Sequence, residues 1–251
     1  MRASNIFLSR FAKKGVGEQQ ATLSGISIKT IILTLVTILT GAISVATGMR
    51  IISVEGFETL EMAMPLWIAF GVSVFIGIFA AMLGLWIPKI ANVMSFIYAI
   101  AQGIYLGVIS AIIDIVFPGV VFMAAGATVI IFLIMLLLYR NNTFRNINLV
   151  YKVMMGIMIG VFACSILFLI MFLITGGLAI PWYIPFLISF AVLIYASLML
   201  VMDFEYAVSV VNAGLDKRYE WVASLSLLIT ILWIYVKVLR ILIILLGNRR
   251  R

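Results

Sequence analysis

The sequence predicts an all-α, polytopic membrane protein with seven transmembrane helices, and three observations support this fold class. Hydrophobic residues make up 65% of the 251-residue chain and charged residues only 10%, whereas a soluble domain has about 25% charged residues. The apolar residues form long continuous runs, not the alternating pattern of a membrane β-barrel. Seven of these runs are long enough to cross a bilayer as a helix of about 20 residues.

The expected elements follow one another with short connections. The polar and basic residues 1–27 are expected to form an N-terminal arm. One transmembrane domain, 28–246, follows it, and a basic tail, 247–251, ends the chain. The predicted spans are 28–49, 64–87, 91–113, 119–139, 150–175, 181–210 and 221–246. Breaker residues such as Pro88 and Gly119 mark the connections between them.

Basic residues predict the orientation of the bundle, because cytoplasmic loops carry an excess of lysine and arginine. One side of the predicted topology holds Arg2, Arg10, Lys13, Lys14, Lys29, Lys89, Arg140, Arg145, Lys152, Lys217 and Arg218. The opposite loops contain only Arg50 among the basic residues. We therefore expect a multi-pass protein of the cell membrane with a cytoplasmic N-terminus. The arginines at 249–251 oppose a seventh crossing, so a last helix that re-enters without crossing is the alternative.

Small residues spaced four apart are expected to let helices pack closely. They occur in three predicted spans, as Gly77, Ala81 and Gly84, as Gly103 and Gly107, and as Gly156 and Gly160. The single cysteine, Cys164, lies in an apolar run and is expected to be a buried, inert packing residue.

Ionisable residues inside the spans gather near the end of the chain. Such a residue at the bilayer centre costs about 2.5–3.5 kcal/mol on insertion scales and indicates a functional site. Asp203 lies about 10 Å inside the cytoplasmic end of the sixth span if that span ends near Val210. Because the seventh span runs in the opposite direction, Thr230 falls at the same depth. Its hydroxyl is expected to donate a hydrogen bond to the Asp203 carboxylate.

Two basic residues lie further along the last span. Lys237 and Arg240 are three residues apart and share a helix face, and Lys237 lies about 10 Å further out than Thr230. We interpret them as the outer part of the same polar seam. Glu205 points about 200° away from the aspartate, so we expect it to be solvated or paired with a basic residue at 217 or 218.

Asp203 has two interpretations at this point. It is either a residue of the cytoplasmic rim, with the sixth helix ending at Met202, or a titratable gate or cation ligand within the bundle. In the second case protonation weakens its attraction to Thr230 or to a lysine, and pH changes the packing of the last two spans.

Other function classes find little support. The chain has no histidine, which removes the usual general base and the commonest transition-metal ligand. We expect no enzyme activity, no cofactor, no confident metal site and no nucleic-acid partner, and the net charge of +8 is assigned to topology and lipid headgroups. The glutamates 55, 58 and 61 suit a weak external cation site, although an ordinary acidic loop is the simpler interpretation.

Several segments in order resemble the Bax inhibitor-1 family, and its bacterial branch most closely. They are LVMDFEY at 200–206, NAGLDKRYEW at 212–221 and LITILWIYVKVLR at 228–240, with further agreement at 22–30, 97–110 and 135–140. The resemblance implies six spans around a central seventh, in a bacterial inner membrane, and a pH-sensitive calcium leak. It also implies a sixth-span aspartate that pairs with a seventh-span aspartate, held by an arginine of the second span. Asp203 matches the first of these positions, Thr230 occupies the second, and the second span has no arginine.

The resemblance and the intramembrane charges together lead to one expected function and one alternative. We expect a leak channel for calcium ions or protons, gated by protonation of Asp203. A lone carboxylate near two basic residues favours pH-sensitive gating over calcium binding. The alternative is a non-conducting regulator of a membrane-anchored protease or another membrane partner, with the N-terminal arm as its contact.

Overall fold

A computed structural model describes residues 20–54, 57–141, 143, 147–175 and 183–249. Within these residues lie seven helices that are long and apolar enough to cross a membrane. Most helices expose large apolar side chains on their outer faces. Lipid is the solvent that accepts such faces, so the predicted class of a multi-pass helical membrane protein is confirmed.

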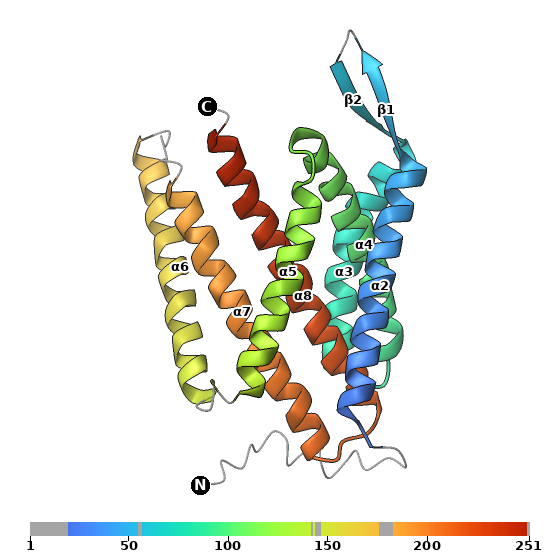
Figure 1. Cartoon of the computed structure of the whole chain (residues 1–251), viewed down its shortest axis with the longest axis vertical. Helices are drawn as coiled ribbons and strands as arrows, with labels where there is room; N and C mark the ends of the chain where they lie inside the picture. Colours follow the sequence, from blue (N-terminus) through green and yellow to red (C-terminus); the bar gives the residue numbers. More distant parts are fainter. Residues whose placement is uncertain (1–19, 55–56, 142, 144–146, 176–182, 250–251) are drawn as a thin grey trace. The chain divides into compact units, whose positions relative to one another are not determined.

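The helices follow the predicted order (Figure 1). Their bounds are α2 (Leu23–Gly48), α3 (Met64–Trp86), α4 (Ala91–Val116), α5 (Val120–Arg140), α6 (Ile147–Thr175), α7 (Tyr183–Asn212) and α8 (Arg218–Arg249). Helix α2 begins five residues earlier than its apolar run, because the threonine at position 22 caps it and its polar first turns still form helix. Helix α8 begins three residues earlier than predicted, at Arg218. Residues 1–19 of the predicted arm lie outside the described residues.

A β-hairpin, which the sequence did not predict, connects α2 to α3. Strand β1 (Met49–Val54) pairs antiparallel with β2 (Phe57–Met62), in a register that joins Met49 to Met62. Figure 1 shows the hairpin extending from the end of α2. The three glutamates considered as a cation site belong to this segment. Glu55 lies outside the described residues, and only the backbone of the other two is described.

The chain divides into two compact units. The first unit comprises 1–116 and 205–228, and therefore contains α2, α3, α4 and the α7–α8 connection. The second comprises 117–204 and 229–251, with α5, α6, most of α7 and the later part of α8.

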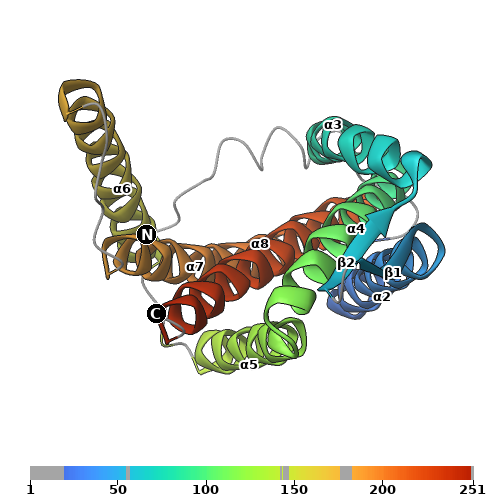
Figure 2. The same cartoon turned by 90° about the horizontal axis from the view of Figure 1, so that it is seen from above.

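Glycines set the helix packing of the first unit. A Cβ at Gly107 would lie 2.7 Å from the Cα of Gly41, and a Cβ at Gly103 would meet the backbone of Thr37. The backbones of α2 and α4 therefore lie in direct contact (Figure 2), as pairs of small residues allow. In α3, a Cβ at Gly77 would lie 2.9 Å from Nε2 of the Gln102 side chain of α4. The predicted close approach of helix backbones is confirmed for the third span, whereas Gly77 of the second span faces a side chain.

Helix α6 does not pack as predicted. A Cβ at Gly156 or Gly160 would meet nothing within 4 Å, and Cys164 is exposed. The prediction of a close helix contact at these glycines is wrong for the described chain, and so is the prediction of a buried cysteine. Both errors have one cause, since an apolar run that faces lipid has the same composition as one that faces protein.

Candidate functional site

Asp203 and Thr230 form a buried polar pair within the second unit. Asp203 lies on α7 and is 6% exposed, and Thr230 lies on α8 and is 1% exposed. The Thr230 hydroxyl donates a hydrogen bond of 2.5 Å to Oδ2 of Asp203. The hydrogen bond expected from helix depth is therefore present. Its role as a gate stays a prediction.

Asp203 lies inside its helix and not at its end. Helix α7 continues to Asn212, nine residues beyond the aspartate. The interpretation that the sixth helix ends at Met202 is therefore wrong. Because the helix continues past Asp203, the backbone amide and carbonyl groups around it stay paired within the helix, as a membrane requires.

The next residue of α7 contacts two rings of α5. The ring centre of Phe204 lies 5.6 Å from that of Phe132, in an edge-to-face arrangement, and 5.7 Å from that of Tyr139. Such pairs stabilise packing beyond the area they bury. Helix α7 is thus held against α5 at Phe204 and against α8 through Asp203.

The chemical change available to this pair is protonation or deprotonation of the Asp203 carboxylate. An ionised carboxylate only accepts hydrogen bonds, whereas a protonated one also donates, and a threonine hydroxyl can do both. Asp203 is the one acidic residue in the sequence of residues 117–204 and 229–251. Any carboxylate titration within the side chains of this unit therefore takes place at Asp203.

Lys237, Arg240 and Glu205 are the other predicted site residues. Lys237 is half-buried, with its Nζ 5.4 Å from the ring centre of Trp233, and Arg240 is exposed. The assignment of Lys237 and Arg240 to the outer part of a polar seam stays a prediction. Glu205 is half-buried in the first unit, and its expected pairing with a basic residue at 217 or 218 stays a prediction.

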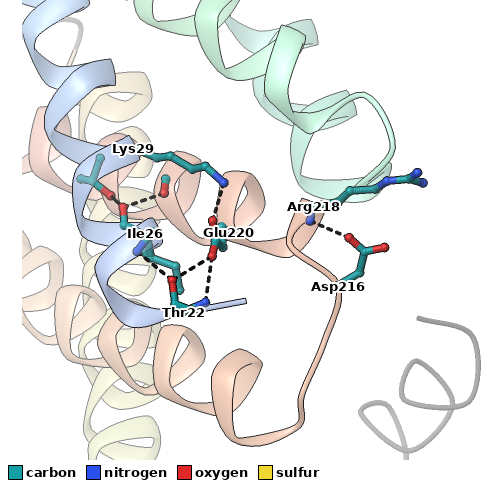
Figure 3. A network of polar contacts seen from close by, with 9 residues as sticks. Thr22, Ile26, Lys29, Asp216, Arg218 and Glu220 are labelled. Atoms are coloured by element: carbon teal, nitrogen blue, oxygen red, sulfur yellow. Dashed lines mark hydrogen bonds and ion pairs between the residues drawn. The ribbon is translucent and has the colours of Figure 1, made fainter. Parts of the chain in front are cut away.

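A second polar network, which the sequence reasoning missed, lies in the first unit (Figure 3). The Glu220 carboxylate, 1% exposed, accepts hydrogen bonds from the Thr22 backbone N–H at 2.8 Å and from the Thr22 hydroxyl at 3.1 Å. It also forms an ion pair of 2.5 Å with Nζ of Lys29, whose side chain is 13% exposed. The same ammonium lies 4.7 Å from the ring centre of Trp221. The network therefore joins the first turns of α2 and α8.

This network also caps α2. The Thr22 hydroxyl accepts a hydrogen bond of 3.0 Å from the Gly25 N–H, as an N-cap residue does. Glu220 supplies the negative charge that a helix N-terminus favours. A side chain at position 25 would displace the Glu220 carboxylate from this network. Two backbone contacts extend the attachment, since Ala21 N–H donates to Leu215 O at 2.8 Å and Gln20 pairs with Asp216.

One sequence signal for this network existed. Lys29 and Glu220 have opposite charge, and each lies within two residues of the start of a predicted span on the same predicted side of the membrane. That signal does not say which of the several spans starting there become neighbours. The sequence is therefore compatible with this ion pair but does not identify the two helices that form it.

Comparisons with known proteins agree with the helical fold. A family model described as Bax inhibitor 1 like matches residues 5–247, nearly the whole chain. No curated protein and no solved structure matches the chain.

Proposed function

Because this chain belongs to the Bax inhibitor 1 like family of membrane proteins, we propose that it forms a pH-sensitive leak pathway for cations, either calcium ions or protons, gated at Asp203. One observation carries this proposal. A carboxylate that is 6% exposed lies within a membrane-spanning helix and accepts a hydrogen bond from a neighbouring span. Ionisable residues in this position are costly and mark ion pathways and proton relays.

The gate works through the strength of one contact. With Asp203 ionised, the hydrogen bond from Thr230 is charge-assisted, and such bonds are roughly twice as strong as neutral ones. Protonation removes the charge and weakens this link between α7 and α8 within the second unit. It also removes the negative charge that attracts a passing cation. The packing of the two helices and the affinity for cations thus change together with pH.

The proposal is tested by flux into proteoliposomes that hold either a calcium-sensitive or a pH-sensitive dye. The wild-type chain is expected to leak one of these cations at a rate that changes between mildly acidic and neutral pH. Asp203→Asn mimics the protonated side chain and should remove this pH dependence. Thr230→Val keeps the shape of the side chain but loses the donor, so it should move the pH at which flux is half-maximal.

Asp216→Asn is the matched control. Asp216 lies in the α7–α8 connection, where its Oδ1 accepts a hydrogen bond from the Arg218 N–H, and asparagine can replace it as acceptor. The control should keep the wild-type pH profile. An unchanged profile in Asp203→Asn, with a wild-type melting temperature, would rule out gating at this residue.

Absence of flux from a correctly folded wild-type chain would favour the alternative, a non-conducting regulator of a membrane protease or another membrane partner. The attachment of Ala21 to Leu215 and of Thr22 to Glu220 supports this alternative, because it anchors the arm at a defined point of the first unit. Deleting residues 1–19 separates the two functions. The deletion should leave flux intact but abolish regulation of a partner.

A further inference from the structure

Trp233, Lys237 and Arg240 form one outward face of α8 in the second unit. Spacings of four and three residues place them on the same side of a helix. Trp233 is 51% exposed, Arg240 is exposed and Lys237 is half-buried. The Lys237 ammonium lies over the Trp233 ring, 5.4 Å from its centre. A tryptophan and two cations are therefore accessible together, and we call them the α8 basic face.

No side chain of this unit neutralises the two cations. The sequence of the second unit contains one acidic residue, Asp203, which is buried and hydrogen-bonded to Thr230. Among the residues that the structure describes, none forms an ion pair with Lys237 or Arg240. Two uncompensated cations within a span require a counter-charge from their surroundings.

The depth of the α8 basic face matches that of lipid headgroups. Lys237 lies 19 residues beyond Arg218, where the helix begins, which corresponds to about 28 Å of helix rise. The hydrocarbon core of a bilayer is about 30 Å thick. A helix that starts at one surface therefore brings Lys237 and Arg240 to the headgroups of the opposite leaflet. Trp233 lies one turn, about 6 Å, before Lys237 along the helix, next to these headgroups on the acyl-chain side.

We propose that the α8 basic face binds the phosphate of an anionic phospholipid in the leaflet opposite to the start of α8. The Arg240 guanidinium suits two phosphate oxygens at once, and the Lys237 ammonium adds a point charge. The Trp233 ring supplies an apolar wall, with an indole N–H that suits a glycerol or ester oxygen. A zwitterionic lipid carries a cation next to its phosphate, which the two basic side chains repel. The site therefore selects lipids with a net negative headgroup.

The test is native mass spectrometry of the full chain, released from detergent micelles with either phosphatidylglycerol or phosphatidylcholine. The wild-type chain should retain phosphatidylglycerol in preference. The double variant Lys237→Gln/Arg240→Gln should bind it about tenfold more weakly or worse, since each cation near an anionic surface contributes appreciably to binding. Binding of phosphatidylcholine should not change. The charge-conserving pair Lys237→Arg/Arg240→Lys should recover most of the lost affinity.

A matched control removes the same charge elsewhere. Arg140→Gln/Lys152→Gln changes two exposed basic residues at the ends of α5 and α6 and should bind phosphatidylglycerol as the wild type does. Inorganic phosphate at the same phosphorus concentration should not displace the lipid, because the acyl chains along α8 add to its affinity. Equal losses in both double variants would overturn the proposal. So would wild-type binding in the α8 variant or displacement by inorganic phosphate.

Discussion

The ion pair between Lys29 and Glu220 allows a quantitative test of how α2 is held to α8 in the first unit. Replacing Lys29 by methionine keeps the length of the side chain but removes its charge. The Glu220 carboxylate, 1% exposed, then keeps the two donors of Thr22 but loses its counter-charge. Removing one partner of a buried ion pair typically costs about 3–5 kcal/mol. Because Thr22 still donates twice, we expect the lower end, about 3 kcal/mol of unfolding free energy.

Removing the charge of Glu220 in place of that of Lys29 should lower the unfolding free energy by a similar amount, for a different reason. Glu220→Gln keeps an oxygen that accepts from Thr22 but directs an amide NH₂ towards the Lys29 ammonium, so two donors face each other. We expect a loss of about 3 kcal/mol here as well. The double variant removes both charges and leaves a neutral amide bonded to Thr22. It should lose about 4 kcal/mol, which is about 2 kcal/mol less than the sum of the single losses.

The assay is unfolding by SDS in mixed micelles, followed by far-ultraviolet circular dichroism. Lys152→Met is the matched control, because Lys152 is exposed on α6, and it should change the unfolding free energy by less than about 0.5 kcal/mol. Losses in the two single variants that add in the double variant to within about 0.5 kcal/mol would refute the reasoning, since additive losses mean that the charges do not interact.

Three further predictions concern other parts of the chain. Gly107→Ala places a Cβ 2.7 Å from backbone atoms of α2 and should cost about 1–3 kcal/mol in the same SDS titration, whereas Gly156→Ala meets nothing within 4 Å and should change stability by less than about 0.5 kcal/mol. Ser189→Ala removes a buried hydroxyl with no hydrogen-bond partner in the described structure, so it should leave the melting temperature unchanged or raise it, and a clear drop would mean that the hydroxyl is satisfied in the membrane. A cysteine added after Arg251 in a Cys164→Ser background should react with an impermeant reagent on intact cells if α8 crosses the bilayer, and protection until lysis would indicate a cytoplasmic C-terminus.

The helices were predictable because lipid imposes a single rule. A membrane span needs a run of apolar residues of nearly fixed length, so seven such runs in the sequence correspond to the seven long apolar helices among the described residues. The exact starts were less predictable, since polar residues continue the first turns of α2 and α8 beyond their apolar runs. The length of apolar runs predicts only the membrane spans. It therefore did not predict the hairpin, which is a short segment between two of these runs.

The two polar networks differ in how far the sequence could identify them. Asp203 and Thr230 lie on consecutive helices that run in opposite directions, and the constant rise of a helix then fixes which residues share a depth. Lys29 and Glu220 belong to helices at opposite ends of the chain. No local rule joins them, because the packing of every intervening helix determines whether they meet. The spacing of Gly156 and Gly160 permits a close contact but cannot create one.

The cap of α2 also has a consequence for biosynthesis. The Thr22 N–H at the start of the first described helix is bonded to a carboxylate 198 residues later in the chain. As the chain leaves the ribosome from its N-terminus, α2 is made long before Glu220 exists. Until the last helix is synthesised, the first turn of α2 lacks this acceptor and Lys29 lacks this counter-charge. Helix α2 is therefore among the last elements to be completed, and the arrival of α8 marks the moment when its N-terminus can become fixed.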